Sequence, residues 1–211
     1  MRILLRRPHA VKLTEPDADV GQPIRQPGPW TSAVLVFLAG MVLLAVTIAI
    51  NVVYFELFPH RYPESTSGSH DIPWAGMAVV FFLCIVIHEL LHALLYPDGG
   101  RSDSTVLFLD WRRLGFGLYY EGRIPRSRWI AMRLFPMVAL TILALTGIFV
   151  LDRWMSFALE SFIWVLILTN NLGSGADLVA VAIVLRQVPK RGVLNFHRGR
   201  AYFLPGDSAG S

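Results

Sequence analysis

Two histidines and a glutamate interrupt an apolar stretch of the chain at residues 88–92, which read His-Glu-Leu-Leu-His. On a helix, residues four apart lie on one face about one turn apart, so His88 and His92 can bind one zinc ion through ring nitrogens. Glu89 follows His88 by about 100° around the helix, where its carboxylate can take a proton from an attacking water molecule. The segment therefore predicts a metal site with a general base beside it.

This His-Glu-x-x-His spacing is the signature of zinc peptidases, and its surroundings make a chance occurrence a poor explanation. Each ionisable residue at the middle of a bilayer costs on the order of 2 to 3 kcal/mol even on the most lenient scale. The alternatives are a polar patch that packs against neighbouring helices and a purely structural metal site. A structural zinc site does not need a carboxylate at Glu89, which favours a catalytic one.

The elements that must position these residues are membrane helices. Hydrophobic residues make up 54% of the 211 residues, too many for an ordinary soluble domain of this length. Four apolar stretches are each long enough to cross a bilayer of roughly 30 Å. We therefore expect an all-α integral membrane protein in which a membrane domain lies between two tails. The expected tails are 1–29 and 189–211, the domain is 30–188, and its helices are about 31–58, 73–96, 129–151 and 155–188.

Basic residues sort by loop rather than forming one patch. They gather before the first apolar stretch, between the second and third, and after the fourth, whereas the other two connections hold only Arg61 and Arg153. This alternation predicts a multi-pass protein in the lipid bilayer with both termini in the cytoplasm, and it argues against a nucleic-acid partner. The single cysteine, Cys84, excludes an intrachain disulfide and is more typical of apolar packing than of a zinc ligand.

The spacing of apolar residues changes from helical to alternating in the long connection after the second stretch. Over about 104–124, apolar residues alternate with their neighbours on both sides of a glycine-containing turn, which predicts a β-hairpin on the cytoplasmic side. The hairpin either covers the end of the helices or offers an edge to an extended substrate, and the sequence favours neither. A second metal site at His60 and His70 is conceivable, but a solvated turn is the better interpretation.

Asp177 is the candidate third ligand. The fourth stretch is interrupted over residues 169–177, and non-helical backbone at membrane depth is tolerated only where protein or water satisfies it. Counted along the helices, Asp177 lies at a depth similar to that of the histidines, whereas Glu160 lies nearer the outer surface. Asn171 and Ser174 could give hydrogen bonds to a substrate or to the ligands. A helix cap or an interhelical hydrogen bond is the alternative role for Asp177.

The third stretch carries two further residues of note. Arg133 lies close enough to the cytoplasmic end to extend its charge to the surface, and Pro136 is expected to bend the helix where it faces the metal.

The combination of His88-Glu89-x-x-His92, Pro136 in the next stretch and Asn171-x-Gly173-Ser174-Gly175-x-Asp177 in the last resembles the putative zincin peptidase family of unknown function. More distantly it is similar to the site-two protease class of intramembrane metalloproteases. The resemblance spans roughly residues 73–185. In site-two proteases the third ligand is an aspartate of a later helix, usually followed by glycine, whereas Leu178 follows Asp177 here.

We therefore expect a membrane-embedded zinc metalloprotease that hydrolyses peptide bonds of membrane-associated proteins. One zinc ion would lie on His88, His92 and Asp177, with Glu89 as the catalytic base. The alternatives are a catalytically silent docking or regulatory protein, against which an intact Glu89 argues, and a transporter, against which the lack of visible repeats argues. The sequence indicates no particular substrate and no oligomeric state.

Overall fold

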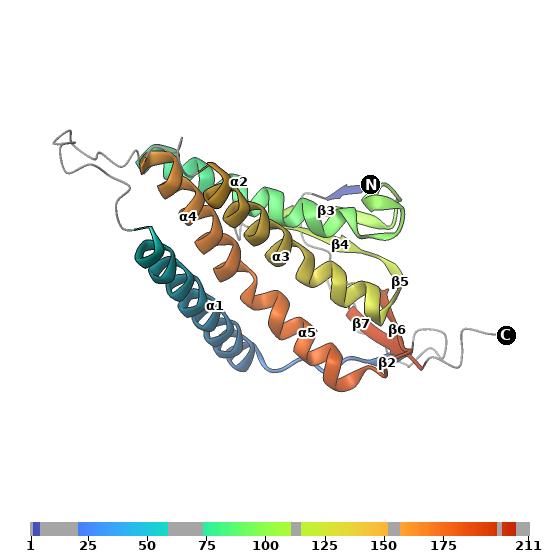
Figure 1. Cartoon of the computed structure of the whole chain (residues 1–211). Coiled ribbons are helices and arrows are strands. Elements are labelled where there is room, and N and C mark those ends of the chain that lie inside the picture. The colour runs from blue at the N-terminus through green and yellow to red at the C-terminus, as the bar shows by residue number, and fades with distance from the viewer. Residues whose placement is uncertain are drawn as a thin grey trace, which may run out of the picture.

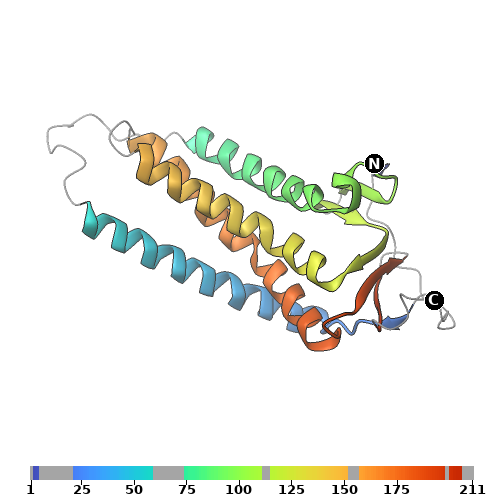
Figure 2. The same cartoon turned by 45° about the vertical axis from the view of Figure 1, so that its right-hand side comes forward.

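Four long helices lie side by side, and short strands gather at one end of them (Figures 1 and 2). The computed structural model describes residues 2–4, 21–58, 74–110, 115–151, 157–197 and 200–205. Its long helices are α1 (Pro29–Leu57), α2 (Trp74–Leu94), α3 (Arg126–Leu151) and the consecutive pair α4 (Phe157–Gly173) and α5 (Gly175–Gln187).

The four spans are long and apolar enough to cross a membrane. Large apolar side chains cover their outer faces, among them Phe37, Phe82 and Leu143, each at least 65% exposed. A soluble monomer rarely exposes such continuous apolar surface, whereas lipid tails would cover it. The predicted number of membrane helices is confirmed by length and composition, and the cytoplasmic placement of the termini stays a prediction.

The predicted interruption of the last span is present, but it is confined to Ser174. Helix α4 ends at Gly173 and α5 begins at Gly175. Ser174 keeps right-handed backbone angles, with φ −70° and ψ −8°, and its N–H donates to the Asn170 carbonyl at 3.0 Å. Together α4 and α5 contact each of the other three long helices, so this interrupted span forms the centre of the bundle.

Glycine allows α5 to approach α1 closely. A Cβ on Gly175 would lie 2.8 Å from the Val36 carbonyl oxygen and 2.9 Å from the Gly40 nitrogen, distances that real Cβ atoms essentially never show. Small residues at such contacts are typical of membrane helices, whose association relies on close van der Waals packing.

The predicted hairpin is confirmed. Strands β3 (Thr105–Asp110) and β4 (Gly115–Tyr120) pair antiparallel with Leu107 opposite Leu118, and β1 (Arg2–Leu4) adds to β3 in parallel. A short 3₁₀ helix, η1 (Pro97–Gly100), leads from α2 toward this three-stranded sheet.

The all-α expectation is wrong in one respect, because a second sheet was not predicted. Its strands pair antiparallel in the order β2-β7-β6-β5, and they come from the connection before α3 and from both tails. Strand β2 pairs with β7 across most of the chain length, and such short strands leave little local signal in a sequence; β6 and β7 form a local hairpin. The strands are β2 (Gln22–Pro23), β5 (Gly122–Pro125), β6 (Val193–His197) and β7 (Arg200–Leu204).

A buried apolar cluster joins this second sheet to the start of α3 and to α5. Ile124 and Leu194 from the sheet pack with Trp129 and Met132 of α3 and with Val184 of α5. The cluster packs α3 against α5, and these two helices carry residues of the candidate site.

Candidate metal centre

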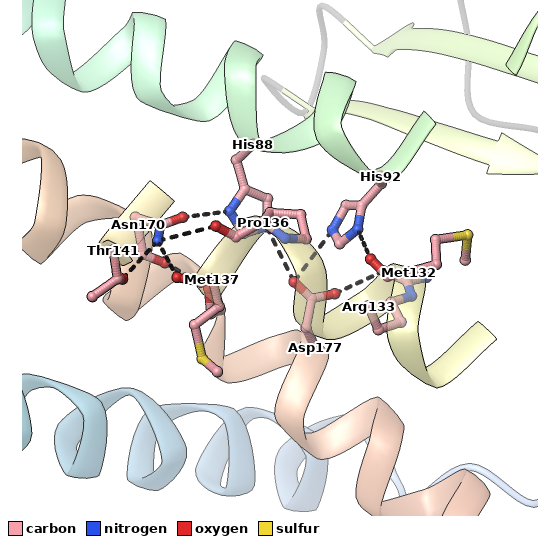
Figure 3. A network of polar contacts seen from close by, with 10 residues as sticks. His88, His92, Met132, Arg133, Pro136, Met137, Thr141, Asn170 and Asp177 are labelled. Atoms are coloured by element: carbon pink, nitrogen blue, oxygen red, sulfur yellow. Dashed lines mark hydrogen bonds and ion pairs between the residues drawn. The ribbon is translucent and has the colours of Figure 1, made fainter. Parts of the chain in front are cut away.

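The structure brings His88, His92 and Asp177 together between α2 and α5 (Figure 3). All three side chains are buried, and one ligand atom from each lies within 4.8 Å of the others. Oδ2 of Asp177 is 3.1 Å from Nε2 of His88 and 3.3 Å from Nε2 of His92. The helical spacing of the histidines thus places both rings on one face of α2, as the sequence indicated.

The other oxygen of Asp177 faces Arg133. Nη1 of Arg133 is 2.9 Å from Oδ1, and the guanidinium carbon lies 5.4 Å from the centre of the Trp129 ring. The sequence placed Arg133 close enough to the cytoplasmic end to extend toward the surface and did not predict this ion pair with Asp177. The two oxygens of Asp177 therefore have different partners: Oδ1 contacts Arg133, and Oδ2 faces the two histidines.

The ring of His92 is oriented from its far side. Nδ1 of His92 lies 2.8 Å from the Met132 carbonyl oxygen. A carbonyl oxygen only accepts, so Nδ1 carries the hydrogen. In a neutral imidazole, Nε2 is then an unprotonated acceptor, and it points at Asp177.

The ring of His88 is oriented by a side chain. Nδ1 of His88 lies 2.9 Å from Oδ1 of Asn170. The amide nitrogen of Asn170 donates to the carbonyl oxygens of Met137, at 3.2 Å, and Pro136, at 3.5 Å, which determines which end of the amide faces the histidine (Figure 3). Nδ1 of His88 therefore donates as well, and its Nε2 is also an acceptor.

Three acceptor atoms consequently converge: two imidazole nitrogens and one carboxylate oxygen. Buried acceptors that face one another without a hydrogen between them are unfavourable, and a divalent cation, or two added protons, satisfies all three. Neutral imidazole nitrogen and carboxylate oxygen are zinc ligands. The donor set therefore fits a zinc ion, and three protein ligands leave the fourth tetrahedral position open, as in catalytic zinc sites.

Glu89 follows His88 on α2 and is half-buried. It is not a member of the group that could hold a metal. Its charge acts on Tyr96, which lies just beyond the end of α2. Burial raises the pKa of the Tyr96 hydroxyl to about 12. The charge of Arg133 opposes this rise, and the charges of Glu89 and Asp177 add to it. Glu89 and Tyr96 thus belong to one electrostatic neighbourhood around the centre.

Asn171 hydrogen-bonds to neighbouring helices, and Ser174 to its own span, rather than to the metal-binding group. Asn171 donates to Oγ1 of Thr47 on α1 at 2.8 Å and accepts from Oγ1 of Thr141 on α3 at 3.0 Å. Thr141 in turn accepts from the Asn170 amide at 3.3 Å, so a hydrogen-bonded chain leads from α1 to His88. Ser174 donates to the Asn170 carbonyl oxygen at 2.7 Å. A direct role for either residue toward a substrate stays a prediction.

Two other residues considered from the sequence lie apart from this group. Glu160 is buried in the first turn of α4 and accepts from the Trp164 indole nitrogen at 3.3 Å. Cys84 lies one turn before His88 and its sulfur contacts the Leu166 carbonyl oxygen at 3.6 Å, which agrees with packing between α2 and α4. The outer loop with His60 and His70 lies outside the described residues.

Sequence reasoning missed Asn170 and the Met132 carbonyl. A second asparagine beside Asn171 in an apolar span was a visible signal, because polar groups at membrane depth need partners. The Met132 carbonyl has no signal in its own side chain, and the signal for it is Pro136, four residues later.

The comparisons with known proteins agree with this chemistry. A family model described as "Putative zincin peptidase" matches residues 81–193, more than half of the chain. The matched segment includes both histidines and Asp177, while α1 lies outside it. The chain matches no curated protein and no solved structure at a significant level.

Proposed function

Because the chain belongs to the Putative zincin peptidase family, we propose that it is a membrane-embedded zinc metalloprotease that hydrolyses peptide bonds of membrane-associated proteins. One observation carries the proposal: the Nε2 atoms of His88 and His92 both face Oδ2 of Asp177, at 3.1 and 3.3 Å, with the far side of each ring already hydrogen-bonded.

The residues of the chain would hold and orient the metal. His88, His92 and Asp177 are the proposed ligands, and Arg133 holds Oδ1 of Asp177 so that Oδ2 alone is directed at the histidines. When bound, zinc supplies a Lewis acid that polarises the scissile carbonyl and makes water a stronger acid.

Glu89 is the proposed catalytic residue. Its carboxylate takes a proton from the attacking water and returns it to the departing amine, so no net proton is consumed in the step. Its position fits this role because it follows a ligand by about 100° of helix rotation and is only half-buried, which leaves a side of the carboxylate for water.

The edge of the three-stranded sheet is a proposed place for the substrate. A helical substrate hides its peptide bonds in its own hydrogen bonds, so the reacting segment must first become extended. In the order β1-β3-β4, strand β4 is at the edge among the described residues, and α2 packs against it. The Tyr96 and Tyr120 rings, 5.5 Å apart, connect the end of α2 to the end of β4. An extended segment could pair with this edge through main-chain hydrogen bonds.

A single substitution tests the enzyme. Glu89→Gln keeps the size of the side chain but cannot accept the proton, so cleavage should fall by about 10² to 10⁴ while about one zinc per chain is retained. The readouts are metal analysis of detergent-purified protein and a comparison of membrane-protein fragments in cells that carry wild type, Glu89→Gln or a deletion. Glu56→Gln, at the exposed end of α1, is the matched control and should behave as wild type.

If Glu89→Gln keeps its zinc and yields the same fragments as wild type, the protease proposal fails. A docking or regulatory protein is then the better explanation, since partner binding would depend on outer faces rather than on Glu89. Zinc flux into vesicles that contain the protein would instead point to a transporter.

A further inference from the structure

Pro136 lies inside α3, where a proline has consequences for the backbone. In a regular helix, the N–H of each residue donates to the carbonyl oxygen four residues earlier. Proline has no N–H, and its ring pushes that carbonyl away from the helix axis. Four residues before Pro136 is Met132, and both residues are buried. The Met132 carbonyl oxygen therefore lacks the N–H donor that a residue four positions later would supply.

This carbonyl is the one that accepts the hydrogen bond from His92. The distance between Nδ1 of His92 and the Met132 oxygen is 2.8 Å, the shorter of the two hydrogen bonds that orient the histidine rings. A buried carbonyl without a donor is costly, and so is a buried imidazole N–H without an acceptor. In this structure, each group satisfies the other.

We propose that Pro136 is a positioning residue for the metal centre. By removing the backbone donor to Met132, it reserves that carbonyl for His92, which places the hydrogen on Nδ1 and turns Nε2 toward Asp177. The inference rests on the proposed zinc site and adds to it a residue that touches neither metal nor substrate. It also assigns the two histidines different supports: an amide side chain for His88 and a freed main-chain carbonyl for His92.

Pro136→Ala tests the proposal because it restores the N–H. The new donor competes for the Met132 carbonyl and draws it back along the helix, so the His92 ring loses its fixed orientation. Loss of such an outer partner typically weakens metal binding 10- to 100-fold. Pro136→Val restores the same N–H with a side chain closer in size to proline, and it should give the same loss.

Leu140→Ala is the matched control. Leu140 is buried one turn further along α3, and its truncation opens a cavity without adding a donor near Met132. It should lower the melting temperature and leave zinc affinity unchanged. The measurements are zinc affinity by competition with a chelator, the melting temperature of the metal-free protein, and the visible absorption of the cobalt-loaded protein, which reports ligand geometry.

The expected result is weaker zinc binding and an altered cobalt spectrum for both Pro136 variants, with neither change in Leu140→Ala. Unchanged zinc binding in either Pro136 variant overturns the proposal, because the restored N–H then has no effect on His92. A loss confined to Pro136→Ala also overturns it, since the cavity would be the cause. A wild-type protein that binds no zinc is a separate outcome, which overturns the proposed function itself.

Discussion

Two adjacent asparagines on α4 provide a sharp test of how the metal centre is oriented. Asn170 and Asn171 are both buried, at 1% and 5% exposure, and both join α4 to neighbouring helices. Of the two, Asn170 is the one with a described hydrogen bond to a histidine, at 2.9 Å to Nδ1 of His88. Asn170→Ala should therefore weaken zinc binding about 10- to 100-fold, which is about 1.4 to 2.7 kcal/mol.

The two substitutions should cost similar stability. Interhelical hydrogen bonds between membrane helices contribute about 0.6 kcal/mol each. Asn171→Ala removes bonds of 2.8 and 3.0 Å, and Asn170→Ala removes the bond to His88 and that of 3.2 Å to Met137, with weaker contacts beside it. We expect about 1 to 2 kcal/mol in each case. A general loosening of the bundle would thus appear in both variants, and a specific effect on the metal in one.

The assay is a chelator competition in detergent, with thermal unfolding of the same samples. Asn170→Asp is a useful third variant, because it keeps an acceptor for the His88 N–H and should retain most of the zinc affinity. The reasoning is refuted if Asn171→Ala weakens zinc as much as Asn170→Ala does, or if Asn170→Ala binds zinc as tightly as wild type.

Two further predictions concern charged and ionisable groups. Asp177→Asn removes the anionic ligand and leaves Arg133 facing a neutral amide, so zinc affinity should fall by more than the about 10- to 100-fold typical of losing an outer partner. Glu160→Gln, at another buried carboxylate, should keep its metal, and equal losses in metal analysis would contradict the assignment. The pKa of Tyr96 is raised from 10.0 to about 12 in the folded protein, so its contribution to stability is complete below pH 10 and is lost as the pH rises through about 12. Tyr96→Phe should reduce the alkaline loss of stability by up to about 2.7 kcal/mol, measured as unfolding free energy against pH, and an unchanged profile would exclude Tyr96 as its source.

The parts of the structure that the sequence predicted depend on local geometry. The histidine pair follows from helical periodicity alone, and the four spans follow from the length of their apolar stretches. The β3–β4 hairpin also has a short-range pattern, because its strands alternate on both sides of one turn. Counting residues from the outer end of each helix placed Asp177 at a depth similar to that of the histidines, because the rise per residue is nearly constant along a helix.

Most of the parts that were missed depend on which face each helix turns toward its neighbours. Neighbouring residues on a helix point about 100° apart, so Asn170 and Asn171 face different partners, and no local pattern tells which one meets His88. The ion pair between Arg133 and Asp177 joins residues 44 positions apart on two helices. Strand β2 pairs with β7, and β5 with β6, across even longer separations. Strands β6 and β7 form a local hairpin, which was not predicted.

The hydrogen-bonded chain from Thr47 to His88 has a consequence for the order in which the helices enter a membrane. The hydroxyl of Thr47 already donates to the Leu43 carbonyl oxygen of its own helix, at 2.9 Å, so this hydroxyl needs no partner on another helix when α1 is inserted. The last span is the least apolar of the four, and its buried polar groups find their partners mainly on α1, α2 and α3. During synthesis those helices are made first. The span that would partition into lipid least readily is therefore made after the helices that carry its polar partners, and a chain without α1 would lack the Thr47 acceptor of the Asn171 amide.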